Sequence, residues 1–471
     1  MFHPSRYLIL PPQFYAQNSP MKLENTKLFV FNERLAQELN LDENIPWDRV
    51  LAGQDLPHKS LSLVYAGHQF GHFVPQLGDG RAHLLGEIEN PQGELFDLQL
   101  KGSGRTPYSR QGDGQSPLAP ALREFLISEA MAFLDIPTTR SLSVVKTNQR
   151  VLRQTDQEGA IVSRLAKAHI RVGSFEYFAA REDKESLKIL TEMTRKRLYP
   201  EAQDWLEMYE LIVSKQASLI AHWMSVGFIH GVMNTDNMSL AGETIDFGPC
   251  AFMDEYRANE VFSSIDRYGR YSYMNQPKIA HWNLSVLAGC LAPLASPDQL
   301  NHLQDILDSW EQKFNQAYLD IYAPKLGIED VKNLDKSMID NWLIYLEEHR
   351  LDFTLAHRNL AKLLKQQDLD YFPKTESFEL WLKRWRSKLN EEFRPQQIVE
   401  LEMNTSNPTV IPRNHLVEKA LRLAEDGDLN YFNNLWSALK TPYQIDQSAQ
   451  AEEFSRPPLE HQKIQATFCG T

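Results

Sequence analysis

Hydrophobic and polar positions alternate with a period of two in several short runs of the first third of the chain. Alternation of this kind predicts half-buried strands, and a turn-forming segment at residues 90–93 joins the first two runs. One helical pattern interrupts the strands between residues 117 and 134, with Pro120 in its first turn. The expected strands are residues 82–89, 95–101, 142–146, 151–154 and 160–165.

After Ser174 the apolar positions recur at helical spacing. The longest such pattern covers residues 201–226, and its apolar side chains predict a core helix. Further helical patterns lie at residues 281–293, 298–322, 338–364, 376–403 and 413–425. The end of the chain, from about Asp446, is polar, and we expect it to be loosely ordered.

This order predicts an α+β protein with a sheet-rich N-terminal lobe and a mostly helical C-terminal lobe. The strands come first, the helices follow, and a polar loop lies between the longest helix and the rest. That arrangement is the plan of a protein kinase, so we expect a bilobal protein-kinase-like fold. Fold alone does not establish activity, and the comparison therefore has to be made residue by residue.

Composition restricts the classes of partner. The chain of 471 residues has a net charge of -13 and no sustained Lys/Arg block, so we expect neither nucleic-acid binding nor a membrane surface. Its three cysteines are widely spaced, which argues against a disulfide framework. There is no run of 18 apolar residues and no secretory leader pattern, so we expect a cytoplasmic protein. An anionic ligand would need a local cluster of basic residues.

Residues 228–249, FIHGVMNTDNMSLAGETIDFGP, carry the densest candidate chemistry. Carboxylate and amide oxygens at the ends of short apolar runs suit a divalent cation that bridges phosphate oxygens. We expect residues 238–240 and 244–245 to form a short hairpin. The alternative is a polar hairpin whose Asp and Asn side chains only satisfy turn backbones.

Several cations precede this loop and would border one cleft in a kinase-like fold. Lys101 ends a predicted strand beside a glycine-rich loop, where it could reach phosphate oxygens, although a surface strand Lys is the commoner case. Glycines would let the backbone approach a ligand, or would simply form tight turns. The other members of this candidate set are Gly78, Gly80, Arg81, Arg164 and Arg171, with a second glycine-acid element that includes Asp113 and Gly114.

The predicted helix at residues 117–134 offers two acids, Glu124 and Glu129. In a kinase-like lobe one Glu of this helix pairs with the strand Lys, here Lys101, and holds it against the phosphates. Both acids border apolar positions, so periodicity does not distinguish them. Either could also lie on a solvated helix face.

The loop at 228–249 aligns with the kinase catalytic loop H-R-D-L-x-x-x-N. His230 takes the His position, Asn237 takes the metal-binding Asn position, and Asp246 begins a D-F-G sequence. Val232 occupies the place of the catalytic Asp, so the usual base for phosphate transfer is missing. The nearest replacement acid is Asp236.

The sequence closely resembles the selenoprotein O family of kinase-like protein adenylyltransferases. The resemblance is dense from about residue 60 to 280. The matching segments are VYAGHQFGHF (64–73), QLGDGRA (76–82), LQLKGSGRTPYSRQGDG (98–114), REFLISEAM (123–131), IPTTRSL (136–142), HIRVGSFEYF (169–178), HGVMNTDNMSLAGETIDFGP (230–249) and GRYSYMNQP (269–277).

The resemblance implies transfer of AMP from ATP to Ser, Thr or Tyr hydroxyls of proteins, the enzyme itself included as a candidate acceptor, with release of pyrophosphate. It implies Asp236 as the proton acceptor, and Glu124 rather than Glu129 as the ion-pair partner of Lys101. Asn237 and Asp246 would hold Mg2+ or Mn2+. The remaining implied ATP-binding residues, with Asp246 also counted among them, are Gly78, Gly80, Arg81, Lys101, Asp113, Gly114, Arg164 and Arg171.

The resemblance also divides the chain into an N-terminal extension packing on the core, a nucleotide-binding lobe, a helical lobe with the catalytic loop and metal site, and a polar tail. These segments are residues 1–60, 61–170, 171–445 and 446–471. The alternatives are a uridylyltransferase or a protein kinase that uses the same cleft, and an ATP-binding pseudokinase that acts as a scaffold.

The resemblance breaks down at the C-terminus. Eukaryotic members carry a selenocysteine there, preceded by a Cys, whereas this chain has Cys469 at the selenocysteine position and Ala466 at the partner position. Some bacterial members bond such a lone Cys to a Cys of the helical lobe. The matching position here is near Phe262, which leaves Cys250 and Cys290 as alternative partners.

Overall fold

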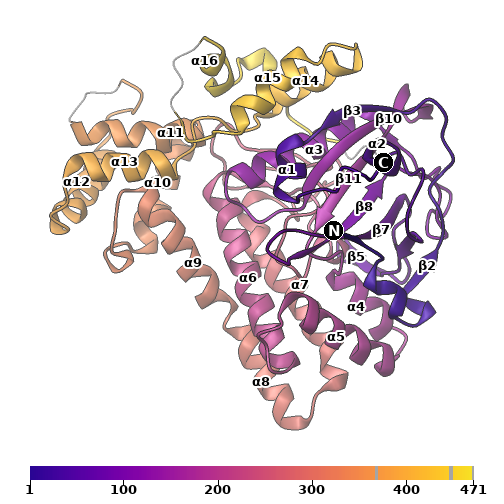
Figure 1. Cartoon of the computed structure of the whole chain (residues 1–471). Helices are drawn as coiled ribbons and strands as arrows, with labels where there is room; N and C mark the ends of the chain where they lie inside the picture. The colour runs from indigo at the N-terminus through magenta and orange to yellow at the C-terminus, as the bar shows by residue number, and fades with distance from the viewer. Residues whose placement is uncertain (366–369, 445–448, 469–471) are drawn as a thin grey trace.

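A large antiparallel sheet forms one side of the molecule (Figure 1). The computed structural model describes residues 1–365, 370–444 and 449–468. Along the sheet the strands run in the order β2 (Tyr15–Gln17), β4 (Leu61–Leu63), β7 (Ala82–Glu89), β8 (Leu95–Lys101), β11 (Asp156–Ala166), β10 (Arg140–Leu152) and β3 (Lys27–Phe31). Short strands β1 (Phe2–His3) and β9 (Ser116–Pro117) pair with β7 and β11. Two separate hairpin-like pairs are β5 (Gly67–Gln69) with β6 (His72–Val74), and β12 (Phe228–Ile229) with β13 (Ala251–Phe252).

The alternation of the sequence predicts the central strands well. Strands β7 and β8 have the expected bounds and pair from Ala82 with Lys101 to Glu89 with Leu95. The two separate strands expected at 142–146 and 151–154 are wrong, because β10 is continuous from Arg140 to Leu152. A register shift between Lys146 and Arg150 interrupts its pairing with β11, and such a bulge breaks the period of two without ending the strand.

Helix α3 (Leu118–Phe133) lies between the sheet and the C-terminal helices. Its first-turn Pro120 and its apolar spacing agree with the predicted helix. Phe125 and Leu122 share a core cluster with Val162 of β11 and with Phe432 near the end of the chain. The helix is therefore buried on two sides, which holds its polar residues in fixed positions.

The remaining helices pack below and beside the sheet (Figure 1). Helix α6 is the longest of those described and packs against α9 at the centre of the largest core cluster. The helices outside the sheet's own core are α4 (Val172–Ala179), α5 (Lys184–Leu198), α6 (Trp205–Ser225), α7 (Gln276–Leu291), α8 (Pro297–Asp308), α9 (Trp310–Lys325), α10 (Lys336–Glu348), α11 (Phe353–Leu360), α12 (Glu376–Glu391) and α13 (Gln396–Ser406). Short helices α1 (Glu33–Glu38) and α2 (Trp47–Val50) lie near the sheet.

Three of the predicted helical patterns are helical in the structure, and each is divided into two α-helices by a break. The pattern at 298–322 breaks at Ser309, between α8 and α9. The pattern at 338–364 breaks after α10, where Arg350 has a positive φ of 52°. The pattern at 376–403 breaks at Phe393, with φ of 50°, and Pro395. Hydrophobic spacing continues across such corners because both helices bury a face in the same core.

The chain returns to the sheet at its C-terminal end. Helices α14 (Asn414–Glu425) and α15 (Asn430–Leu439) pack on α3, as Figure 1 shows above the sheet. The expectation of a loosely ordered end is wrong for residues 449–455, which form α16 (Ala449–Ser455), because Phe454 is buried in the α3 cluster. Cys469 lies outside the described residues.

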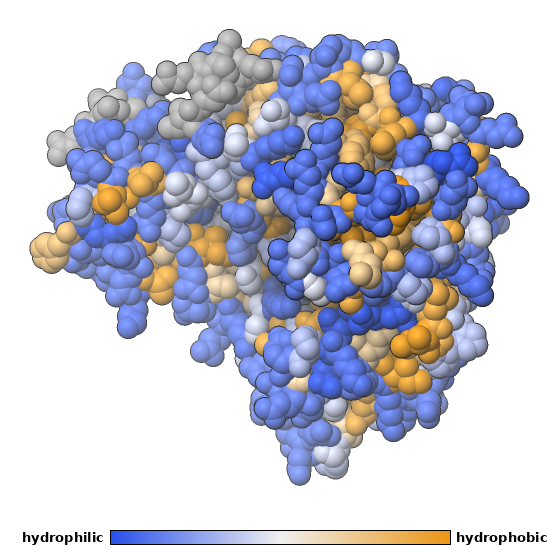
Figure 2. Space-filling view, in the orientation of Figure 1, coloured by the Kyte–Doolittle hydropathy of each residue, from blue (hydrophilic) through white to orange (hydrophobic). Residues whose placement is uncertain are grey.

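Most of the surface in Figure 2 is hydrophilic, with hydrophobic residues in separate patches. One such patch lies over α12 and α13, where Leu380 and Leu401 are exposed. None of the described helices combines the length and apolar character that a membrane crossing would need.

Candidate active site

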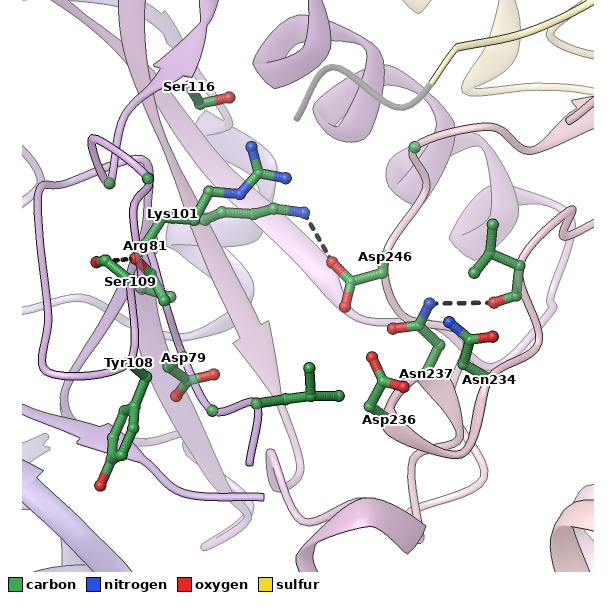
Figure 3. A pocket seen from close by; sticks show the side chains of 18 of the residues that line it. Asp79, Arg81, Lys101, Tyr108, Ser109, Ser116, Asn234, Asp236, Asn237 and Asp246 are labelled. Atoms are coloured by element: carbon green, nitrogen blue, oxygen red, sulfur yellow. Dashed lines mark hydrogen bonds and ion pairs between the residues drawn. The ribbon is translucent and has the colours of Figure 1, made fainter. Parts of the chain in front are cut away.

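One pocket of about 520 Å³ lies where the sheet meets the loop that follows α6, and every predicted site residue lines it. Figure 3 shows Lys101 and Arg81 on the sheet side of this cavity, with Asp236, Asn237 and Asp246 facing them from the loop. Residues far apart in the sequence therefore meet in one cavity.

Asp246 is the meeting point of three cations. Lys101 Nζ lies 2.7 Å from Asp246 Oδ1, and Arg164 donates to the same oxygen. Arg171 Nη1 lies 3.7 Å from Oδ2. Burial alone would raise the pKa of Asp246, but the charges of Arg164, Lys101 and Arg171 outweigh it and hold the pKa well below its usual range. The pocket therefore gathers positive charge within an acidic protein.

Glu124 of α3 holds two of these cations in place. Its Oε2 accepts from Lys101 Nζ at 2.7 Å, and its Oε1 accepts from Arg164. Burial raises the pKa of Glu124, and the charges of Arg164 and Lys101 more than reverse that effect, so the pKa is lowered. Glu129 lies on another side of α3 and binds Arg140 at 2.7 Å. The geometry separates the two acids that periodicity left equivalent.

The hairpin expected at 238–240 and 244–245 is wrong, because the two segments pair with other parts of the chain. Ser239 forms an antiparallel bridge with Arg171, and Thr244 forms a parallel bridge with Thr138. Thr244 O also accepts from the Thr139 backbone N–H at 2.9 Å. Since the loop's backbone groups are satisfied by these neighbours, they need no hairpin. The loop is thereby tied to the sheet-side segments that carry the cations.

Buried His230 connects the two ends of this loop. Its Nε2 donates to the carbonyl of Ile245 at 2.8 Å, and its Nδ1 accepts from the Val232 N–H at 3.3 Å. Burial lowers the pKa of His230, so the neutral ring is favoured. Asp246, which directly follows Ile245, has a φ of +64°, and this value is uncommon outside glycine. His230 thus fixes the backbone that aims the Asp246 carboxylate at the cations.

Asp236 is the second carboxylate of the loop and is almost completely buried. Its Oδ1 has no hydrogen-bond partner among the described residues. Burial raises its pKa to about 7, and the charge of Arg171 opposes that rise. A carboxyl group with a pKa near neutrality is suited to accept a proton at physiological pH.

Gly78 and Gly80 lie beside the loop that contains Tyr108. Gly78 has φ of +89°, and a Cβ there would meet the Tyr108 ring at 2.5 Å. A Cβ at Gly80 would lie 3.0 Å from the carbonyl oxygen of Tyr108. The two glycines therefore allow the Tyr108 loop to pack against the start of β7, where Arg81 enters the pocket.

Asp113 and Gly114 line the pocket beside Arg153. Asp113 Oδ2 binds Arg153 Nη1 at 2.7 Å, and the hydrogen bond from Arg153 is the main cause of the lowered pKa of Asp113. Sequence reasoning did not select Arg153, Asp79 or Tyr108, although all three line the pocket. Asp79 lies between the candidate residues Gly78 and Gly80, and this position in the sequence was the available signal.

The oxygen donors present fit a divalent cation that also binds phosphate. Asn237 Nδ2 donates to the Val232 carbonyl at 3.0 Å, which leaves the amide oxygen on the cavity side (Figure 3). The carboxylate of Asp246 faces the same space. No cluster of three or more His, Cys, Asp or Glu with metal-binding geometry occurs among the described residues. Two protein oxygens suffice for Mg2+ when substrate phosphates and water complete its shell.

Fixed cations around an acidic loop at the junction of a sheet and helices are typical of enzymes that handle nucleotide polyphosphates.

Over residues 1–440 the chain matches the family model described as "Protein adenylyltransferase SelO". It is 45% identical to "Protein nucleotidyltransferase YdiU" of Rhodopseudomonas palustris (strain HaA2), over 99% of this chain and 98% of that protein. The protein of the same name from Clostridium perfringens (strain SM101 / Type A) is also 45% identical, over 99% and 96%.

The chain belongs to the SelO family of protein adenylyltransferases. It is a nucleotidyltransferase enzyme, as its sequence predicted.

Proposed function

We propose that this enzyme transfers AMP from ATP to Ser, Thr or Tyr hydroxyls of proteins. The observation that carries the proposal is the convergence of Lys101, Arg164 and Arg171 on Asp246, in a pocket where Val232 stands at the kinase base position. A pocket with this many fixed cations favours a polyphosphate, and the missing base disfavours transfer of the terminal phosphate. The family's name supports the same reaction.

In the proposed reaction the acceptor hydroxyl oxygen bonds to the α-phosphorus, and the bond from that phosphorus to the bridging oxygen breaks. Pyrophosphate leaves with the electron pair of the broken bond. Lys101, Arg164 and Arg171 bind the phosphates and stabilise the charge on the leaving pyrophosphate. Because Glu124 already holds Lys101 and Arg164, little reorganisation is needed when ATP binds.

Asp236 accepts the proton of the acceptor hydroxyl in this proposal. Its unpartnered oxygen and its pKa of about 7 suit that role. Asn237 and Asp246 would hold Mg2+ or Mn2+, which when bound supplies positive charge to the phosphate oxygens. Gly78, Gly80, Arg81, Asp113 and Gly114 complete the ATP site.

We also propose that the sheet and the helices correspond to the two lobes of a kinase-like fold. The Lys101–Glu124 pair between a strand and α3, and the His230-to-Asp246 loop after α6, match the kinase plan in order along the chain. The boundaries at residues 60, 170 and 445 remain predictions.

Intact-mass measurement after incubation with ATP and either Mg2+ or Mn2+ tests the reaction. We expect an AMP-sized addition to the enzyme or to an added protein, and label transfer from α-labelled but not from γ-labelled ATP. Label from γ-labelled ATP alone would identify a protein kinase, and preference for UTP would identify a uridylyltransferase. ATP binding without any labelling would identify a scaffold. Full activity of Asp246→Ala would overturn the metal assignment.

A further inference from the structure

A second groove of about 480 Å³ continues from the candidate active site along the segment that follows the D-F-G sequence. Phe70 and Ile265 line both the groove and the pocket. The Phe70 backbone N–H donates to Asn234 Oδ1 at 3.0 Å, and Asn234 lies in the same short loop as Asp236. The groove therefore opens into the pocket near the carboxylate that we propose as the proton acceptor.

The charges of this groove are mostly positive. Arg267 and Lys278 are exposed, and neither has a carboxylate partner among the described residues. Arg270 is held more rigidly, with its guanidinium 4.8 Å from the centre of the Trp282 ring. Its Nε is buried without a hydrogen-bond partner in the described part of the chain. In a protein with a net charge of -13, this surface is a local exception.

Among the described residues that line the groove, Asp266 is the one acid beside three cations. Asp266 is buried, and its carboxylate accepts from the backbone N–H groups of Arg270 at 2.9 Å and Tyr271 at 2.7 Å. Its oxygens are thus used to shape the turn. Tyr268 is 97% exposed and Ile265 is 52% exposed on the same lining. Exposed aromatic and aliphatic side chains beside arginines are the composition of protein-binding hot spots.

We propose that this groove binds the acceptor protein through a segment that carries Asp or Glu beside an apolar residue. The acidic side chains would face Arg267, Arg270 and Lys278, and the apolar residue would contact Tyr268 and Ile265. The connection through Phe70 and Ile265 then brings the neighbouring hydroxyl towards Asp236. This inference rests on the proposed transfer of AMP to proteins, and it adds the chemical class of the acceptor.

Peptide acceptors test the groove. Three peptides of equal length, each with one Ser and one Leu, would carry Glu, Gln or Lys around the Ser. For the unaltered enzyme we expect kcat/KM to fall in the order Glu, Gln, Lys. In the double variant Arg267→Glu/Lys278→Glu the ratio of kcat/KM for the Glu peptide over the Gln peptide should fall about tenfold. The control Lys188→Glu/Lys332→Glu makes the same charge change at exposed sites outside the groove and should keep the ratio.

Binding of a fluorescein-labelled Glu peptide with Ala in place of Ser separates the groove from the chemistry. We expect fluorescence anisotropy to show that the unaltered enzyme binds the peptide and that added salt weakens this binding. Binding should be lost in Arg267→Glu/Lys278→Glu and kept in the control Lys188→Glu/Lys332→Glu. If the enzyme transfers AMP but shows no charge preference, the groove proposal fails and the proposed function stands. If the peptide binds as expected but no AMP is transferred to any protein or peptide, the proposed function fails. Equal loss in the control variant, or equal competition by a single-stranded RNA, would overturn the groove proposal.

Discussion

Gly67 lies against the side chain of Asp236 and offers a sharp test of that carboxylate. A Cβ at Gly67 would lie 2.6 Å from Asp236 Oδ1 and 3.0 Å from Leu77 Cδ1. The conformation of Gly67 does not itself require glycine, so the restriction comes from the contact alone. A methyl group here can be accommodated if the Asp236 side chain rotates away, and that rotation would remove its oxygen from the acceptor hydroxyl.

We therefore expect Gly67→Ala to lower kcat by about tenfold to a hundredfold while the KM for ATP changes little, because a displacement of about 1 Å at a reacting group has this effect. Steady-state rates of AMP incorporation measure both constants. Gly289→Ala on α7 is the matched control, since a Cβ there meets nothing within 4 Å. An unchanged kcat for Gly67→Ala would contradict the role of Asp236.

Lys325 gives a prediction for stability rather than for catalysis. Its side chain is buried at 3% exposure in the last turn of α9, and its Nζ donates to Ser406 O at 3.1 Å. Burial lowers its pKa to about 7, whereas the unfolded chain has a Lys pKa of about 10.4. Between these values the unfolded chain binds a proton that the folded chain does not. The free energy of unfolding contributed by Lys325 thus rises with pH over this window.

Replacement Lys325→Met should remove this pH dependence. We expect the stability advantage of the Met variant over the unaltered protein to shrink by about 3 kcal/mol between pH 7 and about 9.5. Urea unfolding at a series of pH values measures it. Lys332→Met alters an exposed side chain and is the control. The difference in the free energy of unfolding between this variant and the unaltered protein should stay constant with pH. A constant difference for Lys325→Met would show that Lys325 keeps its charge when folded.

At the scale of elements, α3 controls the loop that carries Asp246. Glu124 acts through Lys101 and Arg164, and the preceding Arg123 contacts the loop directly. Arg123 Nε donates to the carbonyl of Gly248 at 3.2 Å, and its Nη2 donates to the carbonyl of Cys250. One helix therefore positions both the cations and the backbone after Asp246.

Arg123→Gln should loosen this loop without removing a charge from the pocket. We expect kcat to fall by about tenfold, because hydrogen bonds to charged donors contribute about 1.5 to 3 kcal/mol each. The KM for ATP should change less than kcat, and Arg422→Gln on the exposed face of α14 should match the unaltered enzyme. If Arg123→Gln had the same kcat and the same KM for ATP as the unaltered enzyme, other contacts would hold the loop.

Elements were predicted with uneven success. Strands β7 and β8 and helix α3 followed from periodicity, since each has one continuous buried face. The hairpin at 238–245 failed because hydrophobic spacing does not say which backbone will satisfy a segment, and here Arg171 and Thr138 do so. The breaks between α8 and α9 and between α12 and α13 were hidden by apolar spacing that continues across each corner.

On the scale of the whole molecule, the C-terminal helices pack back onto α3. Phe432 of α15 is fully buried and shares a cluster with Leu122 and Phe125, next to the residues that hold Lys101. Removing this ring should lower the free energy of unfolding by about 3 to 5 kcal/mol. Phe432→Ala is compared with Phe393→Ala, whose ring is 93% exposed and whose removal should change the same quantity by less than about 0.5 kcal/mol.

Chemical denaturation of both variants measures this difference. If Phe432→Ala and Phe393→Ala are equally stable, the C-terminal helices contribute little to the α3 core.

Cys250 and Cys290, which the sequence left as partners for Cys469, are both free and buried among the described residues. Burial raises the pKa of the Cys250 thiol to about 11, which disfavours its reactive thiolate at neutral pH.

The amino-acid sequence is sufficient to predict which reactive groups this protein contains. It identified the loop at 228–249, the absence of the kinase base at Val232, and the basic and glycine residues now found in one pocket, because residue types and their order are local information. Which of these residues lie in contact depends on the three-dimensional fold. It directed three cations to Asp246 and set a basic groove beside the pocket that contains Asp236. These contacts depend on packing between segments that are distant in the chain. A local sequence pattern contains no information about such packing.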